Sequence, residues 1–425
     1  MNTLVATPWR GSVGDGLRYG ALGLPLAFVA LPLYVVLPNH YASEFGVPLA
    51  TLGALLLGAR LFDAVTDPWI GHLADRWFQQ AVARVLLAAV VAAAVLMAGF
   101  RGLFFPPVAD GAALLWWCGG LLAITYFSFS VLSVLHQAWG ARLGGGEAQR
   151  ARIVSWREGL ALVGVMVASV LPSVAGLGVS TGVFAVLLVV GVGLLARAPR
   201  PVHALPAVAA GSWQAPLATP AFRRLLLIYL VNGIASAVPA TLVLFFIRDR
   251  LQVPAWEPLF LASYFAAGAL SMPLWVRAVA RLGLARAWLA GMGLAVAAFV
   301  WAAALGPGDG IAFAIVCVAS GAALGADLAL PSALLAGVIQ RAGHAGRLEG
   351  AYFGLWGLAT KLNLALAAGI ALPLLAWFGY APGSRDAQAL TALTLAYCLL
   401  PCVLKLMAAS LLWWRWIRHP EEQST

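Results

Sequence analysis

Residues 196–220, ARAPRPVHALPAVAAGSWQAPLATP, interrupt an otherwise even succession of long apolar stretches. The segment is rich in proline, alanine and arginine, and proline disfavours a continuing helix because it lacks a backbone N–H. Six apolar stretches precede the segment and six follow it. We therefore expect residues 196–220 to link an amino-terminal domain, residues 1–195, to a carboxyl-terminal domain, residues 221–425.

The apolar stretches are each long enough to cross a lipid bilayer, which takes roughly 20 mainly apolar residues. The chain of 425 residues is 62% hydrophobic and 10% charged, and its mean hydropathy is +0.91. The sequence predicts an all-α membrane protein with twelve transmembrane helices in two pseudo-symmetric six-helix bundles. The stretches begin near Leu17, Leu49, Ala81, Ala112, Arg152, Ser180, Phe222, Pro258, Ala285, Ile311, Gly350 and Ala387.

The net charge of +10 is distributed unevenly between the stretches. If the N-terminus is cytoplasmic, most of the connecting arginines fall on the cytoplasmic side, and only Arg101, Arg248, Arg250 and Arg385 fall on the other. The positive-inside rule then places both termini and the linker in the cytoplasm. We expect an integral protein of the plasma (inner) membrane without a removable signal peptide. Because the basicity reflects topology, no nucleic-acid partner is expected.

Eight charged side chains remain inside the apolar stretches. Each central charge costs roughly 2.5 to 3.5 kcal/mol on insertion scales, so such residues are expected to face the protein interior and to pair. Four are positive and four negative, which allows mutual neutralisation: Arg60, Asp63, Asp67, Arg157, Glu158, Asp327, Lys361 and Lys405.

Three of these charges lie in residues 59–76, ARLFDAVTDPWIGHLADR. Positions 60, 63 and 67 are spaced by three and four residues, which places their side chains on one helix face. Pro68 leaves the carbonyl of Ala64 without its usual helical donor. Asp63 and Asp67 therefore form a hard-oxygen environment that suits a small cation or a shared proton. The alternative is that Arg60 neutralises both acids as a packing device.

The fifth and last stretches contain further charges. We expect Arg157 to reach the paired acids, whereas Glu158 points about 100° away and pairs at the helix end. Lys405 is expected to extend toward lipid headgroups.

The eleventh stretch contains Lys361, which needs an acidic partner. Asp63 or Asp67 of the other domain is the expected partner, and Asp327 is a second candidate. Five residues are possible substrate ligands: Tyr34, His136, Gln137, Asp327 and Asn363. For His136 and Gln137, hydrogen bonds to neighbouring helices are an equally open role.

The motif around these acids resembles that of the glycoside-pentoside-hexuronide:cation symporters of the major facilitator superfamily. The pattern R-x-x-D-A-x-x-D-P-x-x-G is matched without a gap by Arg60, Asp63, Asp67, Pro68 and Gly71. The residues after it also look like the superfamily loop signature G-x-x-x-D-R, with Asp75 and Arg76. Further matches are Arg157 with Gly164, and Tyr352, Lys361, Gly379, Tyr380 and Pro382.

The resemblance implies the major facilitator fold, with Asp63 and Asp67 binding a coupling ion, Na⁺, Li⁺ or H⁺. It implies that Arg60, Arg157 and Lys361 form the surrounding charge network, and that Gly71, Asp75 and Arg76 form a gating loop. The sugar-binding acids of such permeases are absent, since their positions fall at Ala27 and at Leu132 or Ser133.

These observations predict a secondary active transporter, cation-coupled by sodium or a proton, that carries a small organic solute by alternating access. Family frequency favours a sugar or glycoside as the substrate. The missing acids equally suit an amphiphile such as a lysophospholipid, and a non-transporting membrane receptor is a further alternative. No nucleophile elbow, HExxH or P-loop motif indicates an enzyme.

The expected partners are a small-molecule substrate and membrane lipid, for a chain that acts as a monomer. No cofactor is expected, and no metal beyond the coupling cation. The four cysteines, Cys118, Cys317, Cys398 and Cys402, fall inside apolar stretches without metal or redox spacing.

Overall fold

A computed structural model of the chain describes residues 9–108, 111–201 and 213–418, and within these ranges it contains helices and no strand. The described chain divides into two compact units. The amino-terminal unit comprises residues 1–216 and 342–358, and the carboxyl-terminal unit comprises residues 217–341 and 359–425. The boundary near residue 216 falls inside the predicted linker, of which residues 202–212 lie outside the described residues. The sequence did not predict that residues 342–358 cluster with the amino-terminal unit.

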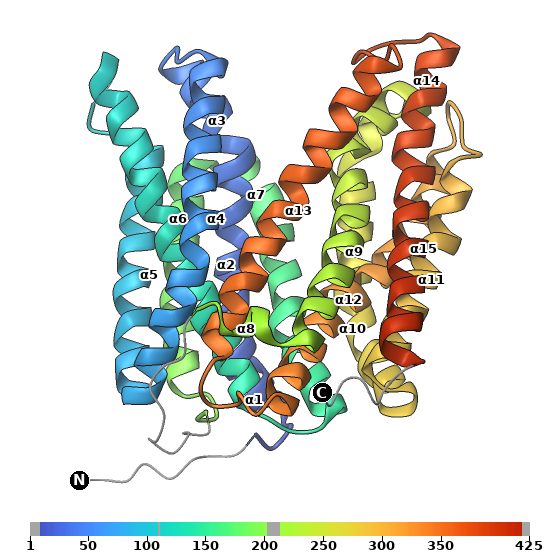
Figure 1. Ribbon diagram of the computed structural model, residues 1–425. Coiled ribbons are helices and arrows are strands. Elements are labelled where there is room, and N and C mark those ends of the chain that lie inside the picture. The colour runs from blue at the N-terminus through green and yellow to red at the C-terminus, as the bar shows by residue number, and fades with distance from the viewer. Residues whose placement is uncertain (1–8, 109–110, 202–212, 419–425) are drawn as a thin grey trace. The chain divides into compact units, whose positions relative to one another are not determined.

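Long helices make up the amino-terminal unit, and α4, α5 and α6 pack on one another in it (Figure 1). The first long apolar segment of this unit, Val13–Glu44, is made of several short helices that follow one another. The elements are α1 (Val13–Gly20), α2 (Gly23–Leu31), the π-helical η1 (Pro32–Val36), α3 (Leu37–Glu44), α4 (Leu49–Gln80), α5 (Val82–Phe104), α6 (Gly111–Arg142), α7 (Glu147–Ala196) and α8 (Ala215–Ala218).

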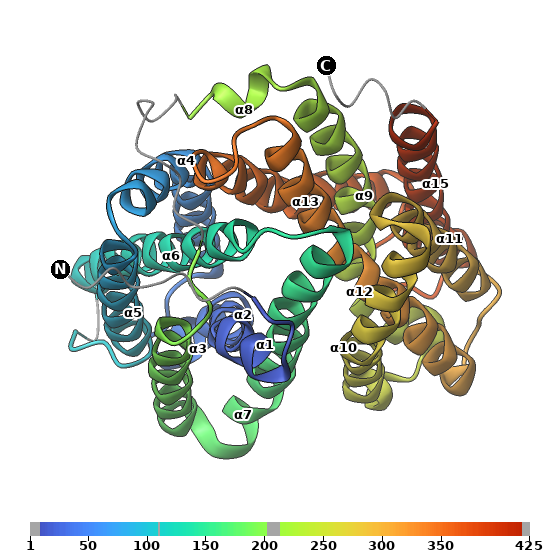
Figure 2. The same cartoon turned by 90° about the horizontal axis from the view of Figure 1, so that it is seen from below.

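The carboxyl-terminal unit is built in the same way. In it α12 packs against α10 and α11, and α15 packs against α9 and α11 (Figure 2). The elements are α9 (Pro220–Phe245), η2 (Phe246–Leu251), η3 (Pro254–Trp256), α10 (Glu257–Leu282), α11 (Leu284–Ala302), α12 (Gly310–Arg341), α13 (Glu349–Trp377), which crosses the unit boundary, α14 (Ala387–Thr394), η4 (Leu395–Leu399), α15 (Leu400–Leu412) and η5 (Trp413–Ile417).

Ten helical segments of the described chain are long and apolar enough to span a membrane. Helix α4 has a similar length, and it contains the charges of residues 59–76. Helix α7 runs for 50 residues and contains a non-helical glycine, Gly176, at φ 79°. This break separates the predicted stretches that begin near Arg152 and Ser180, so the twelve predicted stretches all have helical counterparts.

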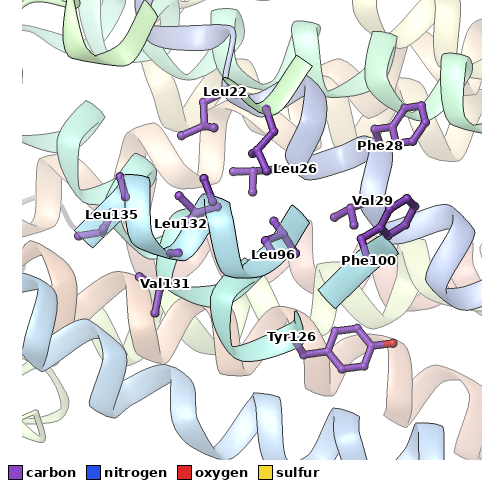
Figure 3. Packing of buried hydrophobic residues seen from close by; sticks show 14 of the residues in the cluster. Leu22, Leu26, Phe28, Val29, Leu96, Phe100, Tyr126, Val131, Leu132 and Leu135 are labelled. Carbon is purple, nitrogen blue, oxygen red and sulfur yellow. The ribbon is translucent and has the colours of Figure 1, made fainter. Parts of the chain in front are cut away.

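Each unit has its own apolar core. In the amino-terminal unit Phe28, Phe100 and Phe184 stack together, with ring centroids 5.8 and 4.7 Å apart. Figure 3 shows Phe28 and Phe100 among the leucines and valines that α2, α5 and α6 contribute. In the carboxyl-terminal unit Phe246 stacks on Tyr397 at 4.3 Å. Aromatic packing of this kind adds to the dispersion contacts on which helix association in lipid depends.

Candidate functional site

The two acids of α4 are buried, at 3% exposure for Asp63 and 1% for Asp67. Ser130 of α6 donates its hydroxyl to Asp63 Oδ1 at 2.6 Å. The close packing of α4 against α6 brings the two side chains together. Two carboxylates one helical turn apart, with a serine hydroxyl on one of them, form a cluster of hard oxygen ligands.

Arg60 lies one turn before Asp63, and its guanidinium stacks over the Tyr34 ring at 3.4 Å from the centroid. Tyr34 in turn stacks on Tyr126 of α6, with ring centroids 6.1 Å apart. The guanidinium of Arg60 is therefore held against an aromatic face. A cation over a partly desolvated aromatic ring is stabilised by roughly 0.5 to 2 kcal/mol.

Glycines bring α4 against the first turns of α13. A Cβ built on Gly71 would collide with the carbonyl oxygen of Gly350, and one on Gly354 would collide with the carbonyl oxygen of Asp67. A Cβ on Gly357 would lie 2.7 Å from Asp67 Oδ2. Because small residues permit this approach, the backbone of α13 covers the side of α4 that carries Asp67.

Asp75 lies four residues after Gly71 and is fully buried. Its carboxylate accepts the backbone N–H groups of Gly350 at 2.7 Å and Ala351 at 2.8 Å, in the first turn of α13. A helix N-terminus has unpaired N–H groups and a partial positive charge, both of which favour a carboxylate. The Asp75 side chain therefore holds the beginning of α13 on α4 through these two hydrogen bonds.

Arg142 at the end of α6 completes this contact. Its Nη2 lies 2.7 Å from Asp75 Oδ1 and 3.0 Å from Glu349 Oε2, while Nη1 donates to the carbonyl of Gly346 at 2.8 Å. The predicted gating loop of Gly71, Asp75 and Arg76 is not a loop, since α4 extends to Gln80. Arg76 is exposed, so of the two charged members only Asp75 takes part in the buried contact.

Arg157 of α7 is buried and pairs with its neighbour in sequence. Its Nε and Nη2 lie 2.9 and 2.5 Å from Glu158 Oε1. The expectation that Glu158 points away from Arg157 and pairs at the helix end was wrong. Two long side chains on consecutive residues can bend toward each other despite the 100° separation of their Cα–Cβ bonds. Within the described residues, Arg157 has no ion pair with the acids of α4.

His136 connects α6 to α1. Its Nε2 lies 2.8 Å from the carbonyl oxygen of Tyr19, and the Tyr19 hydroxyl donates to the His136 carbonyl at 3.1 Å. His136 is 1% exposed, and this reciprocal contact favours the helix-packing role over substrate binding. Gln137 is partly exposed beside it.

Lys361 and Asn363 lie on α13 in the carboxyl-terminal unit. Asn363 is buried against Gly233 of α9, and its Oδ1 has no hydrogen-bond partner among the described residues. The neighbouring Thr360 is hydrogen-bonded to Tyr229 of α9 at 2.8 Å. The pairing of Lys361 with Asp63 or Asp67 would join the two units and stays a prediction.

Asp327 and Lys405 form a buried ion pair, with 2.6 Å between Asp327 Oδ2 and Lys405 Nζ. The expectation that Lys405 extends toward lipid headgroups was wrong: the residue is 6% exposed and is directed into its own unit. Asp327 accepts two further hydrogen bonds at Oδ1, from Asn232 at 3.2 Å and Trp288 at 3.0 Å. Four helices, α9, α11, α12 and α15, thus meet at one carboxylate, whose ionic partner is Lys405 rather than the predicted Lys361.

Sequence reasoning missed Ser130, Arg142 and Glu349. A single serine in an apolar stretch carries no pattern, and Arg142 appeared to be one of many positive charges between helices. Trp288 was missed for a similar reason, since an indole that donates to a buried acid looks the same in sequence as one at the membrane interface. One weak signal for Ser130 was present in the sequence. Ser130 lies three residues before Ser133, one of the two positions at which the resemblance places an acid of sugar permeases.

His344 lies between α12 and α13, and its Nδ1 is 2.8 Å from the Tyr352 hydroxyl. Partial burial lowers the pKa of His344 below its ordinary value, and the nearby positive charge of Arg347 lowers it further. The neutral imidazole is therefore the form that this segment favours.

Comparison with known proteins identifies the family. The model of the family described as MFS/sugar transport protein matches residues 18–417. The Escherichia coli inner membrane symporter YicJ is 28% identical over 169 residues, which cover 38% of this chain and 35% of that relative. The chain thus matches only about a third of the relative's length.

Solved structures show the same fold at low identity. A bacterial homologue of the iron transporter ferroportin, in its outward-facing state, has a TM-score of 0.68 at 17% identity, covering 93% of this chain and 99% of that one. A variant of the E. coli fucose:proton symporter FucP has a TM-score of 0.66 at 13% identity, covering 94% and 99%.

These matches confirm the resemblance drawn from the α4 motif and the predicted all-α fold. They also agree with the absence of enzyme motifs, because the family and the structural neighbours are transporters. The chain belongs to the MFS/sugar transport protein family and is an integral membrane transporter of the major facilitator superfamily.

Proposed function

We propose that this transporter couples the symport of a small organic solute, a sugar or glycoside, to the entry of a small cation. The observation that carries the proposal is the pair of buried carboxylates on α4, Asp63 and Asp67, with the Ser130 hydroxyl on one of them. Two buried acids are costly unless a cation, a proton or a basic side chain compensates them. Ser130 supplies a third hard oxygen beside these acids, which supports a small cation as the compensating ligand.

The oxygens of Asp63, Asp67 and Ser130 are hard ligands and suit Na⁺, Li⁺ or H⁺. When a metal ion binds, Ser130 would turn its proton away from Asp63 and offer a lone pair instead. Backbone of α13 covers Asp67, so water is excluded from that side. Lys361 would compete with the cation for the acids, as an internal counter-charge that is released when the ion binds.

Alternating access needs a contact that forms in one state and breaks in another. The contact of Asp75 with the α13 N-terminus and Arg142 is our candidate for it, because a carboxylate on two backbone amides and a guanidinium has one well-defined geometry. We place this contact on the cytoplasmic side, together with both termini, from the distribution of arginines.

A sugar is supported by the family description and by the symporter relative. The second candidate, an amphiphile, is favoured by the residues at the positions where sugar permeases have acids. Leu132 is fully buried and Ala27 is apolar, so only Ser133 offers a polar group there.

The proposal is tested with purified protein in liposomes. Uptake of a panel of radiolabelled glycosides and lysophospholipids is measured with and without an inward sodium gradient, or a proton gradient at zero sodium. Asp63→Asn and Asp67→Asn should abolish gradient-driven uptake, whereas the control Asp309→Asn, on the connection before α12, should retain it. Gradient-driven uptake that survives in both α4 variants would reject the cation assignment, and binding without uptake of any solute would favour a receptor.

A further inference from the structure

The carboxyl-terminal unit encloses a cavity of its own, of about 320 Å³. Helices α9, α10, α11 and α12, together with η4 and α15, contribute its lining, and every lining residue belongs to this unit. Figure 2 shows these long helices grouped around α12. The walls are mainly aromatic and aliphatic, with Phe260, Tyr264, Phe265, Phe299, Phe313 and Tyr397 as the large side chains. The volume is at the small end of the range for ligand pockets.

The polar groups of the cavity converge at one place. Asp327 and Lys405 both line it, and Ser236 lies between them. The Lys405 ammonium has three protons, of which one goes to Asp327 Oδ2 at 2.6 Å and one to Ser236 Oγ at 3.0 Å. Both oxygens of Asp327 accept hydrogen bonds already. The group with remaining capacity at this point is therefore a donor, the third N–H of Lys405.

Two phenol hydroxyls add to this capacity. Tyr264 and Tyr397 line the cavity, and a phenol hydroxyl can donate one hydrogen bond to a ligand. An aromatic enclosure whose lining includes an ammonium and two phenol hydroxyls differs from engineered apolar voids, which have no such groups.

The net charge of the site decides what it accepts. The aspartate and lysine neutralise each other, so an anionic or cationic ligand would bring an uncompensated charge into a low-dielectric space. An uncharged ligand avoids that cost, and its oxygen atoms can accept from Lys405 and the tyrosines. The aromatic walls favour a flat, apolar body.

We propose that this cavity is a binding site for an uncharged amphiphile, with an aromatic body against the phenylalanines and a hydroxyl-bearing head at Lys405. The residues that line the cavity all belong to the carboxyl-terminal unit, whereas the acids of α4 belong to the amino-terminal unit. The site requires neither a coupling cation nor flux, so it stands or falls independently of the proposed symport.

The cysteines provide the assay. Cys317 and Cys402 line the cavity, whereas Cys118 and Cys398 are buried away from it. Protein in lipid nanodiscs without sodium is treated with N-ethylmaleimide, and alkylation of each thiol is followed by mass spectrometry. The probes share one body and differ in the head: 2-naphthylmethanol, 2-naphthoate, 2-naphthylmethylammonium and naphthalene itself. Equilibrium binding of tritiated 2-naphthylmethanol is measured in parallel, which gives an answer even if the thiols react slowly.

Saturating 2-naphthylmethanol should slow alkylation of Cys317 and Cys402 about tenfold and leave Cys118 and Cys398 unchanged. The two charged probes should bind at least tenfold more weakly, since each leaves a buried charge unpaired. Ala295→Phe, which fills the cavity, should remove both the protection and the specific binding.

A double variant tests the role of the head. Asp327→Asn combined with Lys405→Met keeps the volume and removes both charges, so it avoids leaving one charge buried alone. It should weaken 2-naphthylmethanol severalfold and leave naphthalene binding unchanged. Equal protection of all four thiols, binding that persists in Ala295→Phe, or charged probes that bind as tightly as the alcohol would each overturn the proposal.

Discussion

Breaking the ion pair of Asp327 and Lys405 one partner at a time should destabilise the carboxyl-terminal unit strongly and unequally. Removing one partner of a buried pair typically costs about 3 to 5 kcal/mol, because the other charge stays buried without compensation. After Lys405→Met, the carboxylate keeps hydrogen bonds from Asn232, Trp288 and Ser236. After Asp327→Asn, the ammonium keeps the Ser236 hydroxyl and a neutral amide oxygen as acceptors, and its charge is no longer compensated. We expect about 3 kcal/mol for the lysine variant and about 5 kcal/mol for the aspartate variant.

The assay is a double-mutant cycle on the free energy of unfolding, measured by denaturant titration in mixed micelles. The combined variant Asp327→Asn, Lys405→Met removes both charges and should be more stable than either single variant, with a coupling energy of at least about 2 kcal/mol. Matched controls are Lys405→Arg, which keeps the charge, and Met407→Leu, which changes a lipid-exposed neighbour. Surface substitutions usually change the free energy of unfolding by less than about 0.5 kcal/mol. Changes within that range for both single variants would refute the buried ion pair and would favour a lysine that faces lipid.

Three further outcomes follow from the amino-terminal unit. Ser130→Ala should weaken sodium binding roughly tenfold, whereas Ser130→Thr should retain it, because only the alanine variant loses the hydroxyl that contacts Asp63. Equal sodium affinities of the two variants in calorimetric titration would count against Ser130 as a ligand. Gly71→Ala should destabilise the protein by about 1 to 3 kcal/mol, since its Cβ would meet the backbone of α13. The control Gly58→Ala, on the same helix with open space around it, should be neutral or stabilising by up to about 1 kcal/mol. Similar melting temperatures for the two variants would contradict the close crossing of α4 and α13. The depressed pKa of His344 means that the unfolded chain binds a proton more readily than the folded chain. The contribution of neutral His344 to stability is therefore present above pH 6.5 and is lost as the pH falls through the lower pKa of the folded state. His344→Gln should make the melting temperature less dependent on pH between pH 5 and 7, and an unchanged pH dependence would show that His344 is not its source.

The sequence was most informative where a local pattern sufficed. The spacing of Asp63 and Asp67 predicts one helix face, and the structure buries both acids on α4. Apolar length and the composition of residues 196–220 likewise predict the helices and the region of the unit boundary. These features depend on neighbours within one or two helical turns, which a sequence displays directly.

Contacts between distant segments were not predictable in the same way. Asp327 and Lys405 are 78 positions apart, and the spacing of either residue gives no hint of the other. Asp75 and Gly350 are 275 positions apart, and the backbone amides that hold the carboxylate carry no residue-type signal at all. The ion pair of Arg157 with Glu158 was missed for a different reason. Helical geometry fixes the direction of each Cα–Cβ bond but not the position of the end of a long side chain.

Sodium binding to the purified protein tests the central claim most directly. Equilibrium binding of radioactive sodium, and proton binding in sodium-free buffer, are measured for the parent chain, Asp63→Asn, Asp67→Asn and the control Asp309→Asn, each checked for folding by its elution profile and melting temperature. We expect one saturable site per chain in the parent and in the control, and none in either α4 variant. Saturable sodium binding that persists unchanged in both folded α4 variants would contradict the central claim.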